Sequence, residues 1–240
     1  MLSKIFVPVR GDGMVETVLG HAAALAARHN AHVAVAHCRA SLGLTDGDGT
    51  QRDAASVDLV EENGLMAEVI KRNGRLADLV VVAKPDRDRN LGANSLKSAL
   101  FRTGRPVMMC PQRRPVPADF GQHIAVAWNG SLEASRAVAM TLDLARSAEV
   151  VTVLCGGSGE TKGTTADELV SYYQLHGIAA KVHRFDGRNP GEELLTKTVE
   201  LGASLLVMGA YGQNHERETL FGGNTQTVVD KAEIPVIFVH

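Results

Sequence analysis

The chain has 240 residues, of which 45% are hydrophobic and 22% charged, with a formal net charge of −2. This composition is that of an ordinary globular protein, and the length suits one large domain or two of about 120 residues. Neither half carries the excess of basic residues that nucleic-acid binding needs. No apolar run approaches the roughly 20 residues of a membrane span. Three widely spaced cysteines do not form a disulfide framework. We therefore expect a cytoplasmic protein with no membrane span and no nucleic-acid partner.

The N-terminal half alternates apolar runs with segments of helical periodicity. Val15, Val18, Leu19, Ala22 and Ala26 lie on one face at helical spacing. Apolar runs predict strands at residues 5–9, 33–35, 77–82 and 106–110. The segment 41–49 is rich in Gly and Asp, which is loop composition. We expect no helix there, so the second helix of this half is predicted to be trimmed or absent.

The C-terminal half repeats the same order of elements. Apolar runs predict strands at residues 124–128, 151–153, 203–208 and 235–239, each aligned with a strand of the first half. A second Ala-rich helical face consists of Ala134, Ala137, Val138, Thr141, Leu142 and Ala145. A further helix is predicted at 166–175, where the first half has its loop, and Pro190 followed by two acids marks the start of another. The agreement of ordered elements indicates a duplicated chain.

The duplication predicts an α/β protein of two tandem domains. Apolar runs without polar alternation suit open, twisted, parallel sheets buried on both faces, in a doubly wound, Rossmann-like arrangement. The proline-rich segment 113–121 reads as a linker, which gives domains at 1–112 and 122–240.

The second repeat carries a glycine pattern after its fourth strand. Gly209 and Gly212 follow the apolar run that ends at Met208, and Gly222, Gly223, Asn224 and Thr225 precede a helical stretch. Glycines at the end of a buried strand let a ligand's phosphates approach the backbone, and the free N–H groups of the following helix face that anion. The alternative reading is ordinary loop and helix-cap glycine without a ligand.

This pattern resembles the G-x2-G-x9-G-(S/T) signature of the universal stress protein family, and the resemblance extends over both repeats. It implies an adenine nucleotide, ATP or AMP, with Mg²⁺ accompanying ATP, in a regulatory or protective protein of the stress response. The implied ligand contacts are Ala127, Asn129, Cys155, Met208, Gly209, Gly212, Gly222, Gly223, Asn224 and Thr225. Two positions depart from the family pattern: Gly223 replaces Ser or Thr, and Asn129 replaces an Asp.

The first repeat lacks this signature. Ala83, Lys84, Pro85 and Asp86 follow its fourth strand without a G-x-x-G, and Arg10 stands where the family has its first-strand Asp. We therefore expect 1–112 to be a degenerate repeat and any nucleotide to bind in 122–240.

Two other functions stay open at this point. The chain could be an interaction module that recognises a metabolite, a lipid or a protein partner instead of a nucleotide, which the two departures favour. A small nucleotide-dependent hydrolase is disfavoured, because no general base is evident beside the glycine loop. We expect no enzyme beyond, at most, weak ATP hydrolysis, and no metal-ligand spacing is present among the histidines.

Universal stress proteins commonly dimerise through their final strands, so the resemblance also implies how the repeats assemble. It predicts an intramolecular pseudo-dimer in which residues 107–110 and 236–239 run antiparallel, with a homodimer of the whole chain as a further assembly. The physical support is that an uncovered apolar edge strand is an aggregation hazard.

Overall fold

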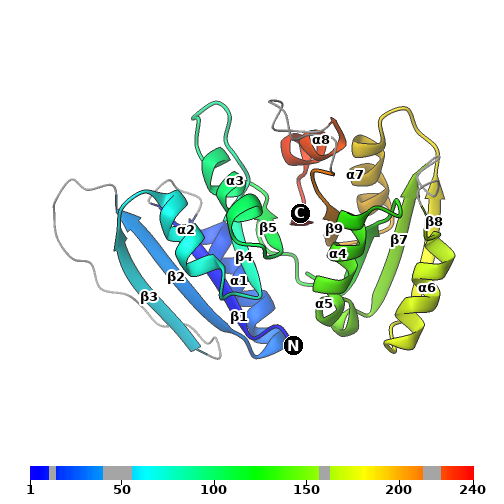
Figure 1. Ribbon diagram of the computed structural model, residues 1–240, viewed down its shortest axis with the longest axis horizontal. Coiled ribbons are helices and arrows are strands. Elements are labelled where there is room, and N and C mark those ends of the chain that lie inside the picture. The colour runs from blue at the N-terminus through cyan, green and yellow to red at the C-terminus, as the bar shows by residue number, and fades with distance from the viewer. Residues whose placement is uncertain (11–14, 40–55, 157–162, 213–222) are drawn as a thin grey trace. The chain divides into compact units, whose positions relative to one another are not determined.

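The computed structural model describes residues 1–10, 15–39, 56–156, 163–212 and 223–240 (Figure 1). The chain divides into two compact units, Met1–Val116 and Pro117–His240. The boundary between the units lies inside the proline-rich segment 113–121.

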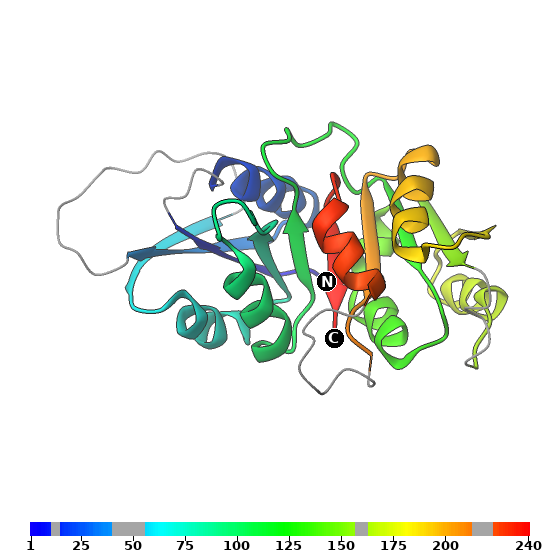
Figure 2. The ribbon, with the colours of Figure 1, turned by 90° about the horizontal axis from the view of Figure 1, so that it is seen from above.

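The first unit is a parallel sheet in the order β3-β2-β1-β4-β5. Helix α1 covers one face of this sheet, and α2 and α3 pack together on the other (Figure 2). The elements in chain order are β1 (Lys4–Val9), α1 (Val15–His29), β2 (His32–Arg39), β3 (Ser56–Asn63), α2 (Met66–Gly74), β4 (Leu79–Ala83), α3 (Ala93–Arg102) and β5 (Val107–Cys110).

The second unit has the matching order β10-β9-β6-β7-β8, again with parallel pairs throughout. Helices α4 and α6 lie on one face, and α7 and α8 pack together on the other (Figure 2). Its elements are β6 (His123–Ala127), α4 (Leu132–Met140), α5 (Leu142–Ser147), β7 (Val150–Gly156), α6 (Ala166–Leu175), β8 (Ala180–Phe185), α7 (Pro190–Glu200), β9 (Leu205–Gly209), α8 (Gly223–Lys231) and β10 (Val236–Val239).

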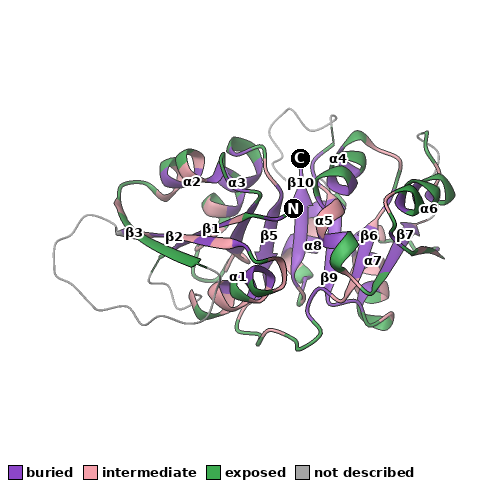
Figure 3. Ribbon diagram, turned by 90° about the horizontal axis from the view of Figure 1, so that it is seen from below, coloured by how far each residue is buried: buried purple, intermediate pink, exposed green. Residues whose placement is uncertain are grey.

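The central strands of both units are buried on both faces, as their uninterrupted apolar sequences predict. In the second unit, Ile124 of β6 lies in register with Val151 of β7 on one side and Leu205 of β9 on the other. All three are almost fully buried, and Figure 3 shows β6, β7 and β9 coloured mainly as buried. The predicted α/β class and the repeated parallel sheet are therefore confirmed.

The Ala-rich helical face of the second unit is divided between two helices instead of one. Thr141 separates α4 from α5, with φ −116° and ψ 14° in place of helical values. Its Oγ1 donates a hydrogen bond of 2.6 Å to the carbonyl of Ala137. A threonine hydroxyl that bonds back to the preceding turn accompanies the break but does not by itself cause it, because Thr198 makes the same bond to Leu194 inside the continuous helix α7.

The edge strand of the first unit is exposed, which differs from the expectation of burial on both faces. Val57, Leu59 and Val60 of β3 are exposed, Leu59 by 61% (Figure 3). Between β2 and β3 the structure describes no helix, whereas α6 packs on β7 and β8 in the second unit, at the predicted residues. The predicted loop at 41–49 lies outside the described residues. Among the helices that are described, none is both long and apolar enough to span a membrane.

Candidate functional site

The predicted contact residues of the second unit gather where its strand order reverses. The chain places β7 and β8 on one side of β6 and places β9 and β10 on the other. In open α/β sheets, ligands bind outside the carboxyl ends of the strands at this reversal. Asn129 follows β6, Gly209 ends β9, and α8 begins at Gly223. Gly222 lies outside the described residues.

Asn129 forms the turn that starts α4. Its Oδ1 accepts a hydrogen bond of 3.1 Å from the N–H of Ser131. Ser131 then caps the helix, because its Oγ accepts the N–H of Ala134 at 3.2 Å. The amide NH2 of Asn129 makes no hydrogen bond to a described residue, and the side chain is exposed.

Gly209 is required by packing. A Cβ at this position would lie 2.5 Å from the backbone N of Ala134 and 2.6 Å from the carbonyl carbon of Glu133. Distances below 3.0 Å to backbone atoms cannot be relieved by a side-chain rotation. The first turn of α4 therefore rests directly on the end of β9, and glycine is what permits that approach.

Gly212 and Gly223 have no such requirement among the described residues. A Cβ on Gly212 would have the Oε2 of Glu133 as its nearest neighbour, at 3.4 Å, which is an ordinary contact. A Cβ on Gly223 would have no described atom within 4 Å. Neither residue has a left-handed φ. Packing and conformation among the described residues therefore do not require glycine at either position.

Tyr211, between the two glycines of the loop, turns the chain away from β9 through a left-handed backbone conformation with φ 57°. This region costs a non-glycine residue about 1–2 kcal/mol. The ring is buried, and its centroid lies 6.4 Å from that of His240 in an edge-on arrangement. Burial raises the pKa of the Tyr211 phenol, with a further contribution from Asp230. A strained, well-anchored residue therefore sets the direction of the loop.

Helix α8 presents its first turn to the same edge of the sheet. Gly223 and Asn224, the first described residues of α8, are exposed. Thr225 is only 7% exposed, and its hydroxyl makes no hydrogen bond to a described residue. The helix is held against α7, where Gly191 allows its backbone to approach that of Asn224. The turn thus offers N–H groups, and a positive dipole end, to an anion.

The other three predicted residues contribute to the walls of the site. Ala127 is half-buried at the end of β6, opposite Leu154 of β7. Cys155 and Met208 are buried in β7 and β9. Cys155 is not in a disulfide, and neither are Cys38 and Cys110. Burial raises the pKa of the Cys38 thiol, in keeping with a small buried hydrophobe at the equivalent strand of the first unit.

Glu133 is a residue of this edge that the sequence analysis missed. It lies in the first turn of α4 with its carboxylate beside Gly212, and it is 7% exposed. An acid beside the glycine loop corrects the expectation that no group able to act as a base lies there. A signal existed in the sequence, because Glu133 precedes Ala137 by four residues and so shares its buried helical stripe.

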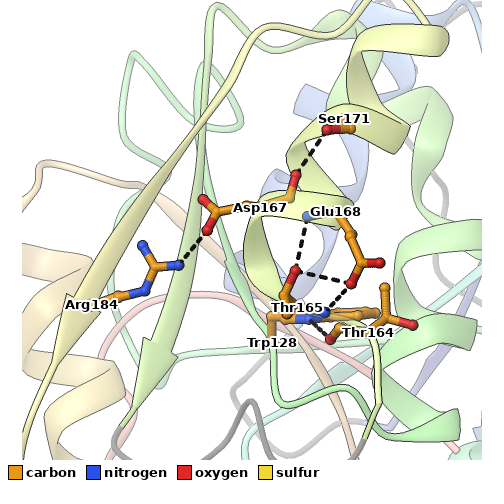
Figure 4. A network of polar contacts seen from close by, with 7 residues as sticks. All are labelled: Trp128, Thr164, Thr165, Asp167, Glu168, Ser171 and Arg184. Carbon is orange, nitrogen blue, oxygen red and sulfur yellow. Dashed lines mark hydrogen bonds and ion pairs between the residues drawn. The ribbon is translucent and has the colours of Figure 1, made fainter.

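A network of polar contacts connects Trp128, the residue that follows β6, with the start of α6 (Figure 4). The indole Nε1 donates to the carbonyl of Thr164 at 3.0 Å. Thr165 is the N-cap of α6 and forms a capping box with Glu168. The backbone N–H of Glu168 donates to Thr165 Oγ1 at 3.2 Å. In return, the carboxylate of Glu168 accepts a hydrogen bond from the N–H of Thr165 at 2.7 Å. These hydrogen bonds lower the pKa of Glu168. Trp128 is therefore a core residue that tethers the start of α6.

A protein-only metal centre has no support in the part of the chain that is described. No group of three or more His, Cys, Asp or Glu side chains is placed to hold a metal ion there. A cation at this edge would need ligands from a bound molecule.

Comparisons with known proteins agree with this architecture. The family model described as universal stress protein family matches residues 121–240. A universal stress protein from Archaeoglobus fulgidus is 16% identical with a TM-score of 0.74, over 98% of this chain and 95% of that one. A Pseudomonas aeruginosa protein of unknown function is 17% identical with a TM-score of 0.67, over 99% and 92%. A universal stress protein in complex with cAMP is 22% identical with a TM-score of 0.38, over 50% and 97%. No curated protein matches.

Proposed function

Because this chain belongs to the universal stress protein family, we propose that it is an adenine-nucleotide-binding regulatory or protective protein of the stress response. The nucleotide binds in the second unit alone, at the carboxyl edge between β6 and β9. The phosphates lie against Gly212 and the first turn of α8, and the adenosine lies near Asn129 and Ala127.

The observation that carries this proposal is the presence of glycine at position 212. It is placed at the strand reversal, yet neither its backbone conformation nor contacts among the described residues require glycine. The N–H groups of α8 supply a ready anion site, and Thr225 adds a buried hydroxyl without a described partner. In the first unit, Ala83, Lys84 and Asp86 occupy the positions of Gly209, Ala210 and Gly212, which supports assigning the ligand to the second unit.

Calorimetry with ATP and AMP in the presence of Mg²⁺ tests the assignment on the full chain. Gly212→Val places a branched side chain where phosphate would approach, and we expect affinity to fall by about tenfold or more, which is about 1.4 kcal/mol. The substitution is compatible with the observed φ, so far-UV circular dichroism should be unchanged. Asp86→Ala, at the equivalent position of the first unit, is the matched control and should bind as the parent does. Unchanged affinity in Gly212→Val would place the ligand elsewhere.

The alternative is an interaction module for a metabolite or another non-nucleotide ligand. Gly223 in place of a hydroxyl residue and Asn129 in place of Asp favour it, because both remove groups that would contact a nucleotide. Mass spectrometry of small molecules released from the purified protein separates the two. A retained adenine nucleotide supports the main proposal, and absence of nucleotide binding in calorimetry supports the alternative.

We expect no physiological turnover of ATP. Glu133 is the described acid beside Gly212, but no described residue is arranged with it as a nucleophile or as a second proton-transfer group. The steady-state rate of phosphate release should stay well below about 1 s⁻¹, the lower end of ordinary enzyme turnover. A rate within the enzyme range that disappears in Glu133→Gln would identify the protein as a hydrolase.

A further inference from the structure

The side chain of Glu133 lies beside Gly209 and Gly212. Its Cβ lies 2.8 Å from the position that a Cβ would take on Gly209, so its stem rests on the end of β9. Its Oε2 and Oε1 lie 3.4 Å and 3.9 Å from the corresponding position on Gly212. The carboxylate therefore occupies the same loop position at which phosphate would approach the backbone.

This carboxylate has no hydrogen bond or ion pair with any described residue, although the side chain is 93% buried, the complement of its 7% exposure. Two other first-turn acids of the second unit have protein partners. Glu168 caps α6 through Thr165, and Glu192 of α7 pairs with Lys231 at 2.6 Å. In α4 the cap is supplied by Ser131, so Glu133 is not used to cap its own helix. A carboxylate without a described protein partner can accept a bound cation or a hydrogen-bond donor.

The position of Glu133 means that a phosphate group bound at Gly212 would lie close to a carboxylate. A bare polyphosphate would lie within a few ångströms of a second negative group, in surroundings where such repulsion is strong. A divalent cation between them converts the repulsion into attraction. Mg²⁺ is typically held by one or two carboxylates together with substrate phosphates and several waters. The described residues provide no group of three ligands, so the cation would not be retained without the nucleotide.

We propose that Glu133 is a specificity-determining residue that makes polyphosphate binding in the second unit depend on a divalent cation. The inference rests on the nucleotide site proposed above. Glu133 contributes one carboxylate ligand, the nucleotide contributes phosphate oxygens, and the site discriminates against metal-free ATP.

Calorimetric titration of the full chain with ATP, in excess Mg²⁺ and in EDTA, measures this dependence. For the parent protein we expect Mg²⁺ to tighten ATP binding by about tenfold or more. In Glu133→Gln, which preserves shape and removes the charge, the ratio should fall to about threefold or less. Most of that change should come from tighter binding of metal-free ATP. Glu16→Gln is the matched control, because Glu16 is the exposed first-turn acid of α1, the equivalent helix of the first unit.

Two further measurements keep the outcome decisive. The parent should bind AMP with a smaller Mg²⁺ effect than ATP, which requires no variant. Mn²⁺ paramagnetic resonance should show a bound ion with ATP present and none with Mn²⁺ alone. Equal ATP affinity with and without Mg²⁺ in the parent, or an unchanged ratio in Glu133→Gln, overturns the role of Glu133 and leaves nucleotide binding standing. Absence of ATP and AMP binding under every condition overturns both.

Discussion

The two units place different structures at the same point of the same topology. After β4 the first unit closes a short turn, in which Asp86 and Leu91 exchange two backbone hydrogen bonds of 2.9 Å and Gly92 starts α3 with φ 81°. After β9 the second unit continues through Tyr211 and Gly212, and α8 begins only at Gly223. The intervening segment is 84–92 in the first unit and 210–222 in the second.

The difference supports the proposal that only the second unit binds a ligand at this point. In the first unit the polar groups of the turn bond to one another and to a neighbouring side chain. The backbone N–H of Arg89 donates to Asp86 Oδ1, and the side-chain amide of Gln112 donates to the carbonyl of Pro85. Backbone groups that bond to one another are not available to an anion. In the second unit Gly212 follows β9 at the strand reversal, where the proposed phosphate site lies. Among the described residues, the units share the strand framework and differ after this strand, where the first has a self-bonded turn and the second has Gly209 and Gly212.

Among substitutions at positions where the two units differ, Gly209→Ala should have the largest effect on unfolding free energy. Gly209→Ala would force a methyl group to within 2.5 Å of the Ala134 backbone, so we expect a loss of about 3 kcal/mol in unfolding free energy. The equivalent residue of the first unit is Ala83, which tolerates its Cβ. Ala83→Gly should cost only about 1 kcal/mol, through backbone entropy. Urea unfolding monitored by circular dichroism measures both.

Gly223→Ala is the matched control for the Gly209 substitution, because no described atom lies within 4 Å of the added methyl group. Its unfolding free energy should change by less than about 0.5 kcal/mol. If Gly209→Ala were as mild as Gly223→Ala, the close packing of α4 on β9 would be wrong.

The next effect concerns two histidines, one in each unit, of which His21 is fully buried and His123 partly buried. Burial lowers the pKa of His21 in α1 and of His123 in β6, from an ordinary value of 6.5. The unfolded chain therefore takes up protons near pH 6.5 that the folded protein takes up only at lower pH. Stability should fall as pH decreases below about 6.5, by at most about 1.4 kcal/mol per pH unit for each histidine.

His21→Leu should flatten this pH dependence more than His123→Gln does, because His21 is fully buried and His123 is only partly buried. The measurement is the slope of unfolding free energy between pH 7.5 and 5.5, which is independent of any constant loss caused by the substitution. A slope unchanged in both variants would show that neither histidine titrates differently on folding.

The smallest of the three effects is at α6, the helix for which the described part of the first unit has no counterpart. Thr165→Ala removes the N-cap and the partner of Glu168, and we expect a loss of about 1 kcal/mol. Thr164→Ala is the neighbouring control, since Trp128 uses the carbonyl of Thr164 and not its side chain. The midpoint of thermal unfolding should decrease for Thr165→Ala and stay nearly constant for Thr164→Ala.

Most of the fold could be predicted from local patterns. The strands appeared as apolar runs except the edge strands β3 and β8, whose mixed sequences gave no such signal. Helix α6 appeared at Ala166–Leu175, and α7 began at the predicted Pro190. These signals are short in range, because strand burial and helix capping depend on neighbouring residues. The break at Thr141 was missed, since a hydroxyl that bonds back to Ala137 looks in sequence like any other residue of the helical face. The exposure of β3 was missed because it depends on whether a helix covers that strand.

The candidate site was predictable only in outline. The spacing of Gly209, Gly212 and Gly223 located it, and the strand order of the fold explains why these segments share one edge with Asn129. The sequence could not separate the glycines by role. Gly209 serves the packing of α4, whereas Gly212 has no structural need for glycine among the described residues.

The sequence by itself determined the class of fold, the duplication and the half of the chain that carries the glycine pattern, because these follow from periodicity and spacing along the chain. Tertiary structure decided that Glu133, far from Gly212 in sequence, lies beside it, and that the corresponding turn of the first unit bonds to itself. Both depend on distances between segments that only the folded sheet brings together. The electrostatic character of the site was therefore decided by packing and not by the motif.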